Sequence, residues 1–403
     1  MQKIILYIFA FSALLFLSNC KMTKALKAKK VFEKNATTVQ NSFFKQEIPF
    51  KLQNKQIVIP VKIENETYDF LFDTGVPCYI SKDLADKLSE KLNLKKLATI
   101  ESKNKKVSFT KIPKITIGNV DFLSNLIMVG DFNTSGCGTI SGAIGANLMR
   151  SAIWKIDYKN QIITLTNSRD SLNLGEAKSI DFQPYPDGVP FFYTNFSPYQ
   201  KIRTLMKTTY YGDLNLPERA RNSMMPSTAK YLKSYGQLRS ANGVGIDTAR
   251  HTAAPYLRFD GGWILQNNAV TFRKSLKSSA SMGYYFLKDY TITLDWQVQK
   301  ISFEQVEKPK RKIENTFGFY QTFTDGKLVF SHIFENSPAS EANLHVSEQI
   351  LMMNGKDLSK ISKEEYCNLQ SIWDSENRNE ITFTVKQKDG EKTLTLKKVN
   401  LDF

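Results

Sequence analysis

Asp73, Thr74 and Gly75 form the element with the clearest chemical potential. They follow the apolar run 70–72, which places a carboxylate at the end of an expected strand. Two carboxylates that share one proton can activate a water: one acts as the base while the other, protonated, polarises a carbonyl oxygen. Asp73 supplies only one of these groups, so this hydrolytic chemistry requires a second carboxylate from elsewhere.

Two expected strands position Asp73. Residues 57–63 and 68–72 are rich in β-branched and aromatic side chains, and the polar segment 64–66 separates them. This pattern is typical of a β-hairpin. The hairpin therefore delivers Asp73 to a loop at its end.

The same ordered features recur further along the chain. Apolar runs at 189–193 and 202–206 lead into Lys207-Thr208-Thr209, so that Lys207 occupies the position corresponding to Asp73. Self-similarity over such a long offset indicates two copies of one architecture.

A closing element is also repeated. Gly145 is followed twelve residues later by Asp157, and Gly283 is followed at the same spacing by Asp295. Asp157 and Asp295 could be interpreted as a catalytic pair. Because each lies between an apolar strand and a polar turn, we favour the interpretation that they begin hairpin turns.

The sequence resembles the retropepsin-like and pepsin-like aspartyl proteases in two features: an apolar strand that precedes Asp73-Thr74-Gly75, and the later segment Ala143-Ile144-Gly145. The resemblance covers residues 46–305 and implies two all-β barrel lobes, at 46–170 and 179–305. It also implies that Asp73 is catalytic, that Thr74 forms hydrogen bonds across the interface between lobes, and that Gly75 permits close backbone packing.

The second lobe departs from the family pattern. Lys207 stands where the second catalytic Asp is expected, and Thr209 stands where Gly is expected. If the lobes pair as in the family, Lys207 faces Asp73, and an ammonium favours the ionised form of a neighbouring carboxylate. Lys207, Thr208 and Thr209 are therefore interpreted as a degenerate second site.

Two other carboxylates could substitute for the missing Asp. Asp247 lies in an Asp-Thr-Ala triplet, but this triplet falls in the region expected to form the second lobe's flap. Asp213 lies six residues beyond Lys207 and is expected beyond the loop. We therefore favour neither as catalytic.

Two functions remain open at this point. In the first, the chain is an aspartic endopeptidase in which Asp73 residues from two chains form a homodimer site, or Asp73 acts with other help within one chain. In the second, it is a pseudoprotease that grips extended polypeptides without cutting them. Both imply a polypeptide partner and no cofactor.

A third domain is expected after the charged linker 307–312, because the sequence pattern there differs from that of the two lobes. Phe317-Gly318-Phe319, the Ser-Pro-Ala segment 337–344 and the Asn-Gly turn within 349–356 resemble a PDZ domain, expected over 313–403. The resemblance implies that Phe317, Gly318 and Phe319 bind a peptide end while a strand edge pairs with the peptide. The alternative is a module that docks on the lobes and binds no ligand.

The N-terminus resembles a bacterial lipoprotein signal. Residues 4–17 form an apolar run too short to span a bilayer, and Leu17-Ser18-Asn19-Cys20 resembles a lipobox. We expect a signal peptide at 1–19, lipidation of Cys20 and a basic tether at 20–45, which would anchor the protein to a membrane in the cell envelope, in the periplasm or on the outer surface. The alternative is a plain signal peptide.

Other sites find little support in the sequence. The separations of Cys78, Cys137 and Cys367 do not indicate a disulfide framework or metal site, although a single Cys78–Cys137 bridge is conceivable. The three histidines are too scattered to bind a metal. The formal net charge of +16 is distributed along the chain without an aromatic and basic RNA-binding motif, so we expect no nucleic-acid partner.

Overall fold

The computed structural model describes residues 29–102, 105–130, 140–197, 200–240, 243–308, 312–367 and 378–402. The expected signal peptide (1–19), Cys20 and residues 21–28 of the tether lie outside the described residues, as does Cys137. The described part is mainly β, as predicted. None of the helices in these ranges is both long and apolar enough to cross a membrane.

The first sheet carries Asp73 at the end of one of its central strands. Its nine described strands are β1 (Thr38–Val39), β3 (Lys51–Gln53), β4 (Gln56–Ile63), β5 (Glu66–Asp73), β6 (Tyr79–Ile80), β7 (Ala98–Ser102), β8 (Lys105–Ile117), β9 (Val120–Val129) and β10 (Gly142–Gly145). The expected hairpin is present as β4 and β5. β5 also pairs in parallel with β10, with Gly145 opposite Asp73.

The second sheet joins the two halves of the chain. In the described residues its six strands are β2 (Lys45–Pro49), β11 (Ile153–Asp157), β12 (Ile162–Thr166), β13 (Lys178–Asp181), β22 (Tyr290–Asp295) and β23 (Lys300–Gln305). β11 and β22 pair along their length, with Ile156 opposite Ile292. Every residue of β22 is buried, so both faces of the strand are covered, and it lies between β23 and β11 in the sheet.

One hydrophobic core runs through both halves. It extends from Phe44 to Phe303 and includes Trp154 and Phe272, both fully buried. Residues 46–170 and 179–305, expected as two lobes, therefore share a sheet and a core. A local sequence pattern does not reveal this, because β11 and β22 are far apart along the chain.

The third sheet holds the second loop and continues into the C-terminal part. Its described strands are β14 (Gln183–Pro184), β15 (Pro190–Ser197), β16 (Gln200–Met206), β17 (Leu214–Pro217), β18 (Leu232–Ser240), β19 (Gly243–Phe259), β20 (Ile264–Arg273), β21 (Ser279–Met282), β25 (Phe319–Thr324), β26 (Lys327–Phe334), β27 (Gln349–Met353), β28 (Lys356–Asp357), β29 (Glu380–Gln387) and β30 (Gly390–Lys397). β15 and β16 form a hairpin, and β16 pairs in parallel with β21. These pairings correspond to those of β4, β5 and β10.

The helices are short. They are α2 (Lys82–Leu92), α3 (Ala146–Met149), α4 (Arg221–Met224), α5 (Tyr284–Leu287) and α6 (Pro338–Glu341), with 3-10 turns at Arg169–Ser171 and Glu218–Ala220. α2 begins after Ser81, whose hydroxyl accepts a hydrogen bond from the backbone N–H of Leu84. Residues 29–34 and 363–367 are also helical.

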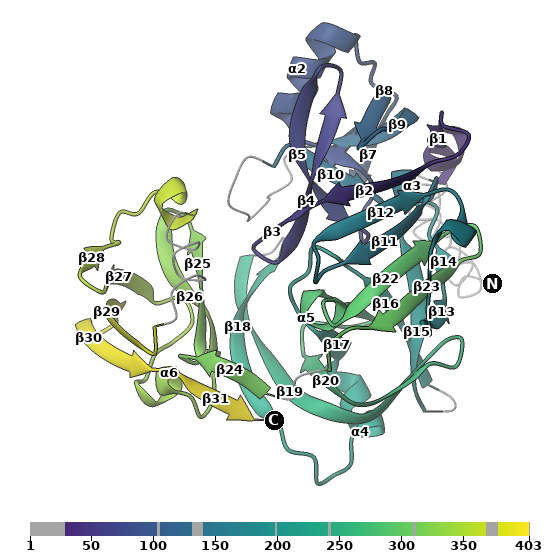
Figure 1. The fold of residues 1–403 in the computed structure, drawn as a ribbon. Coiled ribbons are helices and arrows are strands. Elements are labelled where there is room, and N and C mark those ends of the chain that lie inside the picture. The colour runs from purple at the N-terminus through teal and green to yellow at the C-terminus, as the bar shows by residue number, and fades with distance from the viewer. Residues whose placement is uncertain are drawn as a thin grey trace, which may run out of the picture.

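The C-terminal part has a core of its own and is joined to the rest through β18. Its core includes Phe319, Phe330 and Phe383. β18 pairs antiparallel with β26, which extends the third sheet into the C-terminal part (Figure 1). A small additional sheet pairs β24 (Lys312–Thr316) with β31 (Val399–Asp402), so the end of the charged linker is a strand.

Candidate functional site

Asp73 is positioned by the rigid end of β5. The side chains of Phe70 and Phe72, before it, are fully buried. Gly145 is required on the neighbouring strand, because a Cβ there would lie 2.3 Å from the carbonyl carbon of Pro77. The Asp73 loop and the Gly145 element are therefore packed against each other.

Two threonines connect the Asp73 loop to the second loop. Thr74 Oγ1 donates to the carbonyl oxygen of Met206 at 2.8 Å, and Thr208 Oγ1 donates to that of Phe72 at 2.5 Å. Both threonine side chains are fully buried. The structure thus brings together 73–75 and 207–209, which the sequence places in corresponding positions.

The Asp73 carboxylate is held by two neutral donors. Gly75 N–H donates to Oδ1 at 2.8 Å and Thr209 Oγ1 donates to Oδ2 at 2.7 Å. Asp73 is only 7% exposed. Burial raises the pKa of Asp73 above its ordinary value, while the bonds from Thr209 and Gly75 and the charge of Lys207 oppose that shift.

The side chain of Lys207 packs against Gly75. A Cβ at Gly75 would lie 2.9 Å from Lys207 Cγ, so a larger residue there would have to displace the lysine side chain. The backbone of Lys207 is fixed by its N–H, which donates to the carbonyl oxygen of Met282 at 2.9 Å. Lys207 is half-buried.

This arrangement lacks the pair of acids that shares a proton. Within the described residues no second carboxyl group is hydrogen-bonded to Asp73, and the corresponding positions hold an ammonium and a hydroxyl. The site can therefore hold a single buried carboxyl group and a neighbouring positive charge. No group of three or more His, Cys, Asp or Glu in these parts of the chain could bind a metal ion.

Asp213 and Asp247, the two acids that could substitute for a second catalytic Asp, form hydrogen bonds with residues other than Asp73. Asp213 is half-buried and accepts hydrogen bonds from Thr271 Oγ1 at 2.9 Å and Asn215 Nδ2 at 3.1 Å. Burial raises the pKa of Asp213 to about 6. Asp247 lies within β19 and accepts from both the N–H and the hydroxyl of Ser275.

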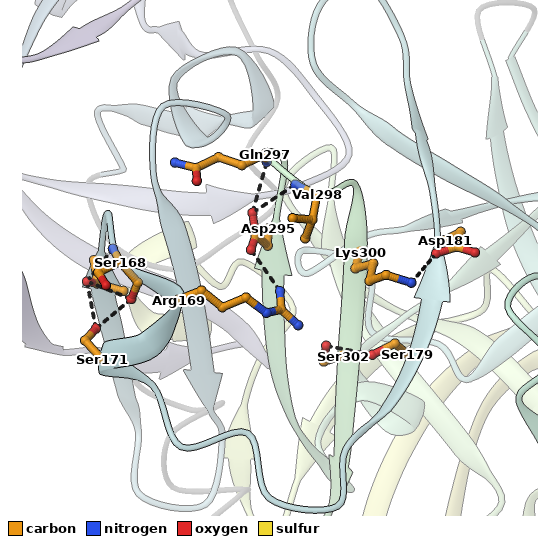
Figure 2. A network of polar contacts seen from close by, with 11 residues as sticks. Ser168, Arg169, Ser171, Ser179, Asp181, Asp295, Gln297, Val298, Lys300 and Ser302 are labelled. Carbon is orange, nitrogen blue, oxygen red and sulfur yellow. Dashed lines mark hydrogen bonds and ion pairs between the residues drawn. The ribbon is translucent and has the colours of Figure 1, made fainter.

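Asp157 and Asp295 belong to turns, as the sequence interpretation favours. Asp157 accepts from the backbone N–H of Asn160 at 3.0 Å. Asp295 accepts from the N–H of Gln297 at 2.9 Å and from Arg169 Nη1 at 2.9 Å (Figure 2). Asp295 thus orders the turn that follows β22 and ties it to the segment after β12.

Lys55, Gln56 and Tyr285 form hydrogen bonds beside the site that the sequence did not predict. Gln56 Nε2 donates to the carbonyl oxygen of Thr209 at 2.8 Å. Lys55 Nζ donates to the hydroxyl oxygen of Tyr285 at 2.7 Å. The Asn54–Lys55 turn could be recognised between two strands of the sequence, but its contact with a residue 230 positions away could not.

The loop expected to bind a peptide end is partly engaged within the protein. Phe317 and Phe319 are buried, and Gly318 has φ +86°, which favours glycine. The N–H of Gly318 donates to Thr316 Oγ1 at 3.0 Å. Phe317 and Phe319 therefore serve the core, and one of the expected N–H donors already has an acceptor.

Cys78 does not form the disulfide with Cys137 that the sequence left conceivable. Cys78 carries a free, buried thiol, and its sulfur accepts from the N–H of Gly145 at 3.0 Å. Burial raises the pKa of Cys78 to about 12, so this thiol is unreactive. Cys367 is disulfide-bonded.

The sequence comparison agrees with the geometry of the first loop. Residues 59–148 match the family model described as aspartyl protease. This stretch includes Asp73, Thr74, Gly75 and the Gly145 element, and it ends before the 207–209 loop. No curated protein matches the chain. The chain is therefore similar, over residues 59–148, to the retropepsin-like aspartyl proteases.

Proposed function

We propose that the protein binds extended polypeptides at the surface around Asp73 without hydrolysing them. The main supporting observation is that Asp73 accepts a hydrogen bond from the Thr209 hydroxyl and lies in the field of the Lys207 ammonium, where the family pattern has a second carboxyl group. The similarity to aspartyl proteases supports a polypeptide ligand. The altered second loop supports loss of the water-activating pair, because general acid and base catalysis here needs both groups.

The bonding of the two loops argues against a homodimeric site. In a homodimer, the Asp73 loop of a second chain would need the place that 206–209 occupies. That place is held by the bonds of Thr74 and Thr208, which are buried. Separation of the two loops would also expose the core that both halves share.

The test is a cleavage and binding assay on the chain without residues 1–20. We expect no new peptide termini by mass spectrometry from about pH 3 to pH 8, and saturable binding of some peptides of a diverse mixture. Cleavage that disappears in Asp73→Asn would overturn the proposal and establish an aspartic peptidase.

A gain-of-function variant provides the positive control. Lys207→Asp combined with Thr209→Gly places a second carboxyl group beside Asp73 and removes the Thr209 hydroxyl. We expect this double variant to acquire slow hydrolysis at acid pH that requires Asp73. Thr209→Gly alone should remain inactive.

We also propose that the protein is a lipoprotein of the cell envelope, anchored through Cys20. The apolar run 4–17 and the lipobox-like 17–20 support this location. Metabolic labelling with a fatty-acid analogue should mark the wild-type chain and spare Cys20→Ser; labelling of Cys20→Ser would contradict the anchor.

The C-terminal part is proposed to be a PDZ-like module that adds a second polypeptide contact. Its β25 pairs only with β26 among the described strands, which leaves the other edge for an added strand. A Cβ at Gly318 would lie 2.1 Å from Ser337 Oγ, so Gly318→Val should distort this edge. Binding of every peptide with unchanged affinity in Gly318→Val would contradict the second contact.

A further inference from the structure

The ammonium group of Lys207 has no acidic partner within 4.0 Å among the described residues. Asp73 attracts it through space, but both Asp73 oxygens are bonded to Gly75 and Thr209. An ammonium carries three donors and loses hydration when it is half-buried. Lys207 is therefore available to an acceptor supplied by a ligand.

Lys55 places a second ammonium at the same edge of the site. Its Nζ lies 5.0 Å from the ring centroid of Tyr285 and donates to the hydroxyl of that residue, which leaves further donors. The bond from Gln56 to the Thr209 carbonyl holds the turn against the second loop. Asn54 and Lys55 have φ +50° and +63°, as a two-residue hairpin turn between β3 and β4 favours, so the hairpin sets the position of the Lys55 backbone.

Tyr211 adds an exposed aromatic surface four residues beyond Lys207. It is 45% exposed, and its ring lies 5.8 Å from that of Tyr210. The same loop is anchored by Tyr285 N–H, which donates to the carbonyl oxygen of Gly212 at 3.1 Å. The aromatic ring can cover the apolar part of a bound chain while the ammonium groups bind a charged part.

We propose that Lys55, Lys207 and Tyr211, which we call the basic rim, select polypeptides that present a carboxylate to the surface beside Asp73. This inference rests on the proposed function. The carboxylate can come from an Asp or Glu side chain or from the C-terminus of the ligand, because both offer the same two acceptor oxygens. A charge-assisted hydrogen bond to an ammonium is stronger than a neutral one.

The local charge balance favours an anion. The rim contributes two ammonium groups, and Asp73 is the carboxyl group that lies beside Lys207. The oxygens of Asp213, the next acid along the loop, accept hydrogen bonds from Thr271 and Asn215, and no ion pair joins Asp213 to the rim among the described residues. An acidic ligand would therefore complete the charge pairing of the site.

The test measures peptide affinity by fluorescence anisotropy at pH 7 in 0.15 M and 0.5 M salt. The peptides form matched pairs: Glu against Gln at one internal position, and a free C-terminal carboxylate against an amide. We expect the wild-type chain to prefer at least one carboxylate form roughly tenfold, as one charge-assisted bond implies. The preference should shrink at high salt.

Variants assign the preference to the rim. Lys207→Met should abolish the carboxylate preference, while Lys207→Arg should keep most of it. Lys62→Met removes an exposed lysine of β4 and should change nothing. Equal affinity for both members of each pair, or a preference that survives in Lys207→Met, overturns the inference and leaves the proposed function in place. Failure of every peptide to bind overturns both.

Discussion

Thr74 and Thr208 each donate a hydrogen bond to the backbone of the loop that carries the other. Thr74 Oγ1 reaches the carbonyl oxygen of Met206, and Thr208 Oγ1 reaches that of Phe72. The two backbone N–H groups point back to the same hydroxyls, at 3.2 Å and 3.4 Å. The two loops are therefore paired through their threonines, with Lys207 and not an acid preceding Thr208.

Loss of either threonine hydroxyl should destabilise the protein. Thr74→Val or Thr208→Val leaves a buried carbonyl oxygen without its donor, at a cost of about 1–3 kcal/mol. Urea denaturation followed by tryptophan fluorescence would measure it, and the two effects should not add, because the bonds form one network. Thr395→Val, which removes an exposed bond to Thr382, should change stability far less.

Asp73→Asn should stabilise the folded protein at pH 7. Burial raises the pKa of Asp73 above its ordinary value of 3.8, so the folded state binds the proton more tightly than the unfolded chain. The contribution of Asp73 to the free energy of unfolding is fully present below pH 3.8. It is lost as the pH rises through the pKa of Asp73 in the folded protein. Asp73→Asn avoids this loss of stability because asparagine does not ionise.

The gain in melting temperature of Asp73→Asn should therefore be largest at neutral pH and vanish near pH 3.8. Asp181→Asn serves as control, because Asp181 is exposed and forms an ion pair with Lys300 on the surface. A melting-temperature difference for Asp73→Asn that does not change with pH would contradict the proposed burial effect.

Acid should weaken the junction of β18 and β26. Burial lowers the pKa of His332 from 6.5 to about 4 and that of His251 to about 3, with the charge of Arg273 acting in the same direction and that of Asp247 opposing it at His332. Both histidines are held neutral in the fold. Their contribution to stability is present above pH 6.5 and is lost as the pH falls through the folded pKa values.

Hydrogen exchange of β18 and β26 at pH 7, 5.5 and 4.5 would check this prediction. Protection should decrease with acid in the wild-type protein and decrease less in His332→Gln. His345→Gln alters an exposed histidine beside Glu348 and should reproduce the wild-type profile. Equal acid sensitivity of the wild type and His332→Gln would argue against the role of His332.

Much of the architecture that positions Asp73 could be predicted from local pattern. The hairpin of β4 and β5 follows from alternating apolar residues, and the place of Lys207 opposite Asp73 follows from the repeated order of elements. The bond from Thr209 to Asp73 was not predicted, because Thr209 was considered only as a replacement of glycine. Its hydroxyl position depends on the paired loops.

Contacts between distant segments could not be predicted. Lys55 meets Tyr285 and β18 meets β26 because the tertiary fold brings the strand edges and loop ends together, and no local periodicity encodes such partners. The shared core of the two halves escaped prediction for the same reason. It depends on the pairing of β11 with β22, whose apolar faces are equally compatible with separate lobes.

Gly236→Val should detach the C-terminal part from β18. Gly236 lies opposite His332, and a Cβ there would lie 2.3 Å from His332 Nε2, so the added side chain must displace the imidazole from the strand junction. Trypsin should then cleave the charged linker at 307–312 faster than in the wild type. Gly245→Val is the matched control: a Cβ at Gly245 meets nothing within 4 Å, and cleavage should proceed at the wild-type rate. Equal linker cleavage in both variants would show that the C-terminal part is held by contacts other than this junction.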